Sequence, residues 1–275
     1  MANWDRITSR GDVEDRRSMA PAVGGISVTG VALLLLVNYL SGGSLSDGLG
    51  QVANQVIQQQ QSPASDTSQF QGDDSYQIFA SEVLGSDNDM WKARFSDLGK
   101  KYTAPKLVLF RQATESGCGV ATSQVGPHYC PIDQTVYLDE TFFDELTTRF
   151  GAKGGDVAQA YVIAHEVGHH AQNELGTMEK VQQHETNEDS VKLELQADCY
   201  AGLWANSLKD KQIFEPGEIN EAIDAAAAVG DDRIQQKVEG YVNPETWTHG
   251  SSEERVSWFN KGYNTGDLEA CDTFQ

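Results

Sequence analysis

The sequence has few positively charged residues. Its 20 lysines and arginines face 41 aspartates and glutamates, which gives a formal net charge of −21. An acidic surface repels the phosphates of nucleic acids and the head groups of anionic lipids. We therefore exclude a nucleic-acid partner and a protein that lies flat on an anionic membrane. Before residue 22 the arginines and acids balance, so the whole excess of negative charge lies after that point.

Cysteine is scarce as well, and no two cysteines have the C-x-x-C spacing of a cysteine-ligated zinc site. The four cysteines are Cys118, Cys130, Cys199 and Cys271. An even number in a chain exposed to an oxidising compartment predicts two disulfides. Cys118 and Cys130 flank a short loop and are expected to pair, which leaves Cys199 for Cys271. The sequence does not exclude the other pairings.

One long hydrophobic run occurs, at residues 22–40. Roughly 20 apolar residues span a bilayer. Arg16 and Arg17 precede the run, and the next positive charge is Lys92. By the positive-inside rule, the pattern predicts a single-pass protein of the cytoplasmic (inner) membrane, with residues 1–21 in the cytoplasm and the remainder extracytoplasmic or periplasmic. A cleaved signal peptide is disfavoured because the charged head is long and no A-x-A site follows. A buried core helix is disfavoured by the Gly-Ser sequence that comes next.

The rest of the chain divides into a linker and one domain. Residues 41–74 are rich in Gly, Ser and Gln, which predicts a flexible linker. Residues 75–275 are long enough to bury a core. Expected helices cover 76–84, 87–102, 141–151, 157–175, 188–208 and 216–232, and expected strands cover 106–110 and 134–139. The predicted fold class is therefore α+β, mostly helical with a small sheet, preceded by one transmembrane helix.

The stretch AYVIAHEVGHHAQNELG, residues 160–176, carries the most specific pattern. On a helix, His165 and His169 lie on one face and can bind one ion together, whereas His170 points away. Zinc accepts neutral imidazoles, and Glu166 beside the ion can act as general base and acid on a zinc-activated water. This is the H-E-x-x-H signature of zinc metalloproteases. A helix that merely carries polar residues is disfavoured, since unpartnered polar groups in an apolar segment are costly.

A catalytic zinc needs a third protein ligand. The metzincin continuation is absent, because Gln172 and Leu175 occupy its positions, and the inverted motif H-x-x-E-H does not occur. The next predicted helix, residues 188–208, supplies Glu194 as the expected third ligand. Asp198 follows one turn later and is placed to accept the spare N–H of a ligand histidine, which would fix its orientation. Asp198 as a direct ligand is the alternative.

HEVGHH followed by ELQADCYAG resembles the gluzincin arrangement, with two histidines on one helix and E-x-x-x-D on the next. More closely, the chain resembles the bacterial family named "putative neutral zinc metallopeptidases", whose members carry one N-terminal membrane span. The stretches SGCGVA, YCPIDQTVYLD, AAAAVGDDRIQ and THGSSEERVSWF extend the resemblance over most of residues 75–275. It implies a zincin-like metalloprotease domain and a bound Zn²⁺, without naming a substrate.

Residues 248–263, THGSSEERVSWFNKGY, hold two further candidates. Zinc proteases need a hydrogen-bond donor opposite the general base to stabilise the oxyanion. His249 is the candidate donor, because the layout is similar to a segment of membrane-anchored gluzincins; Tyr241 is a weaker one. Ser251 can cap a helix in whose first turns Arg255 would pair with a site carboxylate. The alternative is a surface loop followed by an ordinary helix start.

These patterns favour a membrane-anchored zinc-dependent endopeptidase that hydrolyses peptide bonds of a peptide or protein substrate on the extracytoplasmic side. A zinc-stabilised binding or scaffold module is disfavoured by the presence of Glu166. A zinc amidase acting on cell-wall peptide would share the same site and stays open. An edge strand beside the H-E-x-x-H helix is expected to take the substrate backbone by β-augmentation. The stretch 117–121, in which two glycines flank Cys118, is the candidate edge strand. Alternatively, these glycines only form a turn.

Overall fold

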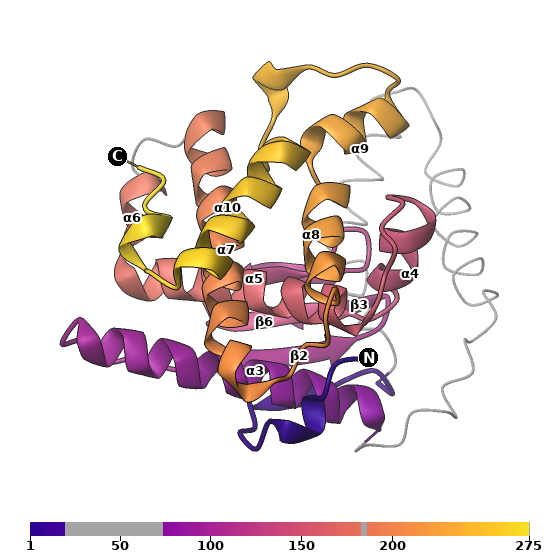
Figure 1. The fold of residues 1–275 in the computed structure, drawn as a ribbon. Helices are drawn as coiled ribbons and strands as arrows, with labels where there is room; N and C mark the ends of the chain where they lie inside the picture. The colour runs from indigo at the N-terminus through magenta and orange to yellow at the C-terminus, as the bar shows by residue number, and fades with distance from the viewer. Residues whose placement is uncertain (20–73, 183–185, 275) are drawn as a thin grey trace.

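A computed structural model describes residues 1–19, 74–182 and 186–274 (Figure 1). These residues form an α+β fold with eight α-helices and six short strands. The helices are α3 (Ser75–Asp97), α4 (Phe142–Thr148), α5 (Asp156–Leu175), α6 (Thr177–Gln182), α7 (Asn187–Ser207), α8 (Ile219–Ala228), α9 (Asp231–Val238) and α10 (Ser252–Thr265). The strands are β1 (Val13–Asp15), β2 (Lys106–Phe110), β3 (Ala113–Ser116), β4 (Gly119–Thr122), β5 (His128–Cys130) and β6 (Thr135–Asp139).

Four strands form the main sheet, in the order β1-β2-β6-β5. The first three strands are parallel, and β5 pairs antiparallel with β6 at the edge. The predicted strands at 106–110 and 134–139 are thus confirmed as the two central ones. Helix α5 packs against β5 and β6, with α3 beside it (Figure 1).

Alternating side chains on β2 belong to two different cores. Leu107 and Leu109 lie in the main core with the helices, whereas Val108 and Phe110 lie in a smaller core with Ala121 of β4. Successive side chains of a strand point to opposite faces of the sheet. The small β3–β4 hairpin therefore covers the face that the helices leave open, and the unbroken apolar run KLVLF fits a strand that is buried on both faces.

Both expected disulfides are present. Cys118, in the turn of the β3–β4 hairpin, pairs with Cys130 of the edge strand β5. Cys199 of α7 pairs with Cys271, which lies in a short 3₁₀ turn at Glu269–Cys271. The first disulfide fixes the hairpin to the sheet, and the second fixes the C-terminal segment to α7.

Three of the predicted helices have boundaries at a glycine that differ from the structure. The helices predicted at 76–84 and 87–102 are one continuous helix, α3. Gly85 does not end this helix; a Cβ there would lie 2.6 Å from the backbone nitrogen of Arg10, so the glycine lets the N-terminal segment come close. The helix predicted at 216–232 is instead two helices, because α8 ends at Ala228 and Gly230 caps the start of α9.

Helices α7 and α10 cross at very short range. A Cβ on Gly202 would lie 2.1 Å from the carbonyl oxygen of Phe259, and one on Gly262 would lie 2.0 Å from that of Cys199. Only glycine fits at both positions, since real Cβ atoms do not come that near to backbone atoms. The crossing places the first turn of α10 against the middle of α7, where the predicted site residues lie.

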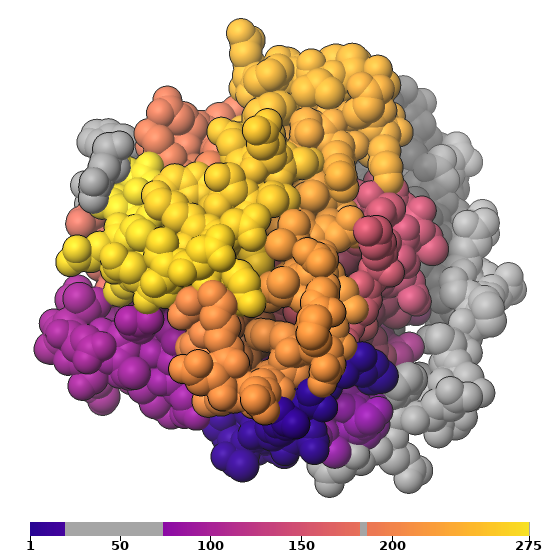
Figure 2. All heavy atoms as spheres, in the orientation of Figure 1, coloured from indigo at the N-terminus to yellow at the C-terminus, as the bar shows by residue number. Residues whose placement is uncertain are grey.

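Residues 1–19 belong to the same folded body as the domain, contrary to the predicted boundary at 1–21. Strand β1 completes the main sheet, and Trp4 is buried in the main core. Its Nε1 donates to Asp156 at the start of α5 at 2.7 Å. Arg17 is fully buried and forms ion pairs with Asp15, Asp74 and Glu140. Figure 2 shows this segment (indigo) lying against the orange segment that follows α7.

The predicted transmembrane helix is corrected by the structure. No helix among the described residues is both long and apolar enough to cross a membrane. The predicted span at 22–40 and the linker at 41–74 lie outside the described residues, apart from Asp74. The predicted topology needs residues 1–21 and 75–275 to be separated by a membrane, whereas β1 and Trp4 share one sheet and one core with the domain. Over the described residues, the fold class is α+β without a transmembrane helix.

Candidate metal centre

Helix α5 carries the H-E-x-x-H residues. It ends at Leu175 and is followed by Gly176, whose left-handed φ of 81° makes it a glycine C-cap. Its N-cap is Gly155, and the Asp156 carboxylate accepts hydrogen bonds from the N-terminal segment. A Cβ on Gly168 would lie 3.2 Å from Cα of Ala197. Gly168 therefore lets α7 come close to α5 between the two histidines.

The structure brings the three predicted ligands together from α5 and α7. Nε2 of His165 lies 3.1 Å from Oε2 of Glu194, and Nε2 of His169 lies 3.3 Å from Oε1 of the same carboxylate. Their ligand atoms all lie within 4.8 Å of one another. Ligands of a tetrahedral zinc ion are about 3.3 Å apart. Two imidazoles and one carboxylate at these separations fit zinc. His170 points away, toward the hydroxyl of Tyr129.

Asp198 holds His165 from behind. Its Oδ1 lies 3.0 Å from Nδ1 of His165 and also accepts from the hydroxyl of Tyr161. Nε of Arg255 donates to Oδ2 at 2.8 Å, and its Nη2 donates to Oδ1 at 3.0 Å. Asp198 is fully buried with both oxygens engaged, so it lies behind His165 and not among the three converging ligand residues.

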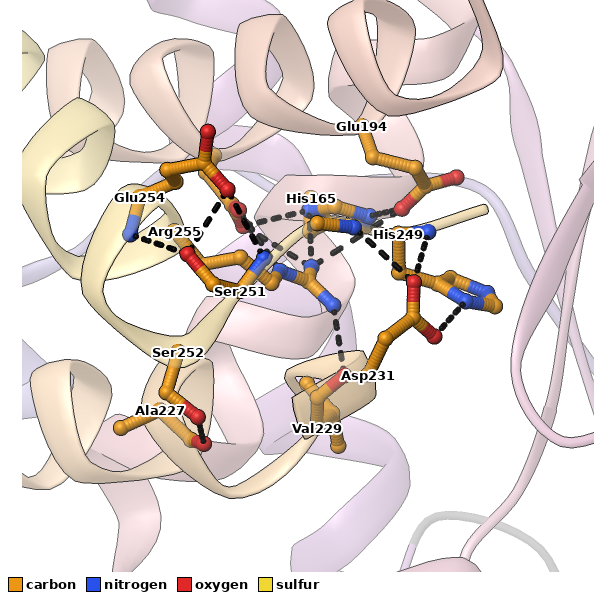
Figure 3. Close-up of polar contacts among 12 residues, drawn as sticks. His165, Glu194, Ala227, Val229, Asp231, His249, Ser251, Ser252, Glu254 and Arg255 are labelled. Atoms are coloured by element: carbon orange, nitrogen blue, oxygen red, sulfur yellow. Dashed lines mark hydrogen bonds and ion pairs between the residues drawn. The ribbon is translucent and has the colours of Figure 1, made fainter. Parts of the chain in front are cut away.

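Arg255 lies where α10 meets the site, as Figure 3 shows beside His165 and Glu194. Its Nη2 is 3.8 Å from Oε2 of Glu194, and its Nη1 donates to the carbonyl of Val229 at 3.2 Å. Burial alone would lower its pKa, but the charge and hydrogen bond of Asp198, together with Tyr161 and Glu194, outweigh burial and raise the pKa well above the ordinary value. Ser251 caps α10 in the expected capping box with Glu254. The cap thereby fixes the turn that carries the arginine.

The carboxylates also control the charge of the histidines. Burial lowers the pKa of His165, but the hydrogen bonds and charges of Asp198 and Glu194 outweigh it and raise that pKa to about 10. Burial raises the pKa of Glu194, but the nearby His169 and His165 lower it well below its usual value. These directions apply to the protein chain alone. A divalent cation between the same groups replaces the imidazole protons.

Glu166 opens onto a cleft of about 540 Å³. The cleft is also lined by the three ligands, by His249 and by residues 125–129, which include most of the edge strand β5. Glu166 is 7% exposed, and among the described residues no group forms a hydrogen bond with its carboxylate. The side chain is therefore available to a water molecule or to a substrate in the cleft.

His249 reaches the same cleft from the loop before α10 (Figure 3). Its Nδ1 lies 3.1 Å from Oδ1 of Asp231, whose Oδ2 accepts the backbone N–H groups of Thr248, His249 and Gly250. Asp231 therefore fixes both the ring and its loop. Tyr241, the weaker candidate, is 61% exposed and does not line this cleft.

Three polar residues at the site were missed by the sequence reasoning. Tyr161 lies four residues before His165 and Gln172 lies three residues after His169, so helical spacing places both on the ligand face. That spacing could have been used to predict both residues as part of the site. Asp231 had none, because its contact with His249 joins two segments that only the fold brings together.

Comparison with known proteins agrees with this site. The family model described as "Putative neutral zinc metallopeptidase" matches residues 2–274. The chain is 42% identical to "Uncharacterized protein YpfJ" of Escherichia coli over 98% of both chains. It is 46% identical to "Uncharacterized protein Rv2575" of Mycobacterium tuberculosis, over 77% of this chain and 76% of that protein. No solved structure matches the chain significantly. On the family match and the zinc-type ligand set together, this chain belongs to the neutral zinc metallopeptidase family.

Proposed function

We propose that this chain is a zinc-dependent endopeptidase that hydrolyses peptide bonds with a metal-activated water. The carrying observation is Glu166, whose carboxylate has no hydrogen-bond partner among the described residues and opens onto a cleft beside three converging zinc ligands. A scaffold that kept zinc only for stability would need neither the open cleft nor this carboxylate. His165, His169 and Glu194 would hold the ion, which when bound lowers the pKa of a coordinated water and polarises a peptide carbonyl.

The side chains around the cleft divide the remaining work. Glu166 takes the proton of the attacking water and passes it to the leaving amine. His249 faces the oxyanion as a donor. Since Asp231 accepts its Nδ1–H, Nε2 can donate to the oxyanion only when both ring nitrogens carry a proton. Asp198 holds His165, and Arg255 in turn holds Asp198.

The substrate backbone is proposed to pair with β5. The stretch 117–121, expected as the substrate-binding edge, forms the hairpin that covers the other face of the sheet. Residues 125–129 line the cleft, and β5 has β6 on one side and no strand on the other within the described residues. An extended peptide can therefore add to that side by β-augmentation.

Removal of zinc tests the proposed function. We expect the purified full chain to contain about one zinc ion, to lose cleavage of an unfolded protein substrate on chelation, and to regain it with added zinc. Metal analysis measures the zinc content, and mass spectrometry of the products measures the cleavage. A chain that binds zinc but cleaves no substrate would support the scaffold function instead. A chain that cleaves only cell-wall peptide amides would be a zinc amidase.

We further propose that the described body folds in an oxidising, extracytoplasmic compartment. Both disulfides support this, since structural disulfides are rare where thiols are kept reduced. Alkylation of protein taken directly from cells, followed by intact-mass analysis, should find all four cysteines blocked from the reagent. Free thiols in the native protein would contradict the proposal.

A further inference from the structure

The His169 ring is held from behind by an amide. Its Nδ1 lies 2.8 Å from Oε1 of Gln172, while Nε2 faces Glu194. Gln172 is fully buried and lies one turn after His169 on α5. The corresponding partner of His165 is the charged Asp198, so the two ligand histidines have supports of different charge.

Backbone carbonyls fix the orientation of this amide. Nε2 of Gln172 lies 2.7 Å from the carbonyl oxygen of Leu193, which can only accept a hydrogen bond. The NH₂ group must therefore face Leu193, and the oxygen must face His169. A second buried amide continues the chain of contacts: Gln196 accepts from Gln172 at 3.1 Å and donates to the carbonyl of Cys271 at 3.1 Å. Neither amide can flip without losing its carbonyl acceptor.

This orientation determines the tautomer of His169. An amide oxygen only accepts, so Nδ1 of His169 must carry the proton. In the neutral ring Nε2 then keeps its lone pair on the side of Glu194, where a metal ligand is required. Gln172 also fixes the third ligand, because Leu193 directly precedes Glu194 in the chain. One side chain thus sets the ring of one ligand and the backbone of another.

We propose that Gln172 and Gln196 are positioning residues of the zinc site. They hold His169 in its metal-binding tautomer and link it to the C-terminal segment, which the Cys199–Cys271 disulfide fixes to α7. The inference rests on the proposed function only in taking zinc as the ion. It proposes that two amides strengthen metal binding although neither is a ligand of the metal.

Zinc affinity of the purified full chain, measured by competition with a chelating dye, tests this assignment. Loss of a partner behind a ligand histidine typically weakens metal binding about 10–100-fold. We expect a loss in that range for Gln172→Leu and a smaller loss for Gln196→Leu. Gln172→Glu keeps an acceptor for Nδ1–H and should restore most of the affinity, although it cannot donate to Leu193. This rescue separates support of His169 from simple helix packing.

Asn206→Leu is the matched control. Asn206 is an amide on α7 that donates to the carbonyl of Tyr263 at 2.7 Å, without contact to the ligands. The Asn206→Leu substitution should lower the stability of the metal-free chain and leave the zinc affinity unchanged. Native-like zinc affinity in Gln172→Leu, with only a stability loss like that of Asn206→Leu, would overturn the proposal while leaving the peptidase function intact. A native chain that binds no zinc would overturn both. If Gln172→Leu does not fold, equal weakening by Gln172→Glu and Gln196→Leu also counts against it.

Discussion

Replacement of Glu166 by Gln should reduce peptide cleavage by about 10²–10⁴-fold while the zinc content stays at the native level. The amide occupies the same space but cannot take a proton from the attacking water. Because Glu166 is not among the three converging ligand residues, the ion should remain bound. Single-turnover cleavage of an unfolded protein substrate, together with metal analysis of the same sample, measures the two effects separately.

The control for this change is Glu174→Gln on the same helix. Glu174 accepts from Gln134 at 3.2 Å and does not line the cleft, so its replacement should leave the rate near that of the native chain. Equal cleavage by the native and Glu166→Gln forms would remove this carboxylate from the reaction. Loss of zinc from Glu166→Gln would instead mean that it acts as a ligand.

The largest effect on stability is expected from Asp198→Asn. The amide no longer carries the charge that balances Arg255, which is 3% exposed. Breaking a buried ion pair from one side costs about 3–5 kcal/mol, because the other charge stays buried without compensation. Asn also cannot accept from His165, Tyr161 and Arg255 with both terminal atoms. Denaturant unfolding of the metal-free chain measures the loss directly.

Two further variants define the cause of that loss. Asp198→Asn combined with Arg255→Met removes both charges and should recover much of the free energy of unfolding. Glu188→Gln breaks only an exposed pair with Lys192 on the same helix, so the free energy of unfolding should change little. If the double variant is no more stable than Asp198→Asn alone, the uncompensated arginine is not the source of the loss.

The local part of the site could be predicted from sequence, and the assembled part only in outline. The spacing of His165 and His169 on one helix face requires no tertiary information, and Glu194 with Asp198 follows from the same rule on the next helix. Arg255 was placed near a site carboxylate from its position after a helix cap. Its actual partner depends on the glycine-mediated crossing of α7 and α10, which sequence spacing does not show.

The larger errors came from the N-terminal part. A run of apolar residues with flanking arginines predicts a transmembrane helix whether or not the preceding segment packs on the domain. Nothing local marks β1 as a strand of the sheet, because its partner β2 is about 90 positions later and parallel pairs need long connections. The glycines of 117–121 indicate a turn but not which face of the sheet the hairpin covers, and they do not show that β5 forms an edge of the main sheet.

The ion pair between Arg17 and Asp74 has a consequence for the length of the chain between them. The two side chains meet at 2.9 Å, so two positions that are far apart in the sequence are neighbours in the fold. In general, the entropy of holding two points of a chain together grows only with the logarithm of the number of residues between them, by about 0.6 kcal/mol for each doubling. The fold therefore places almost no constraint on how many residues separate the first strand from the first long helix.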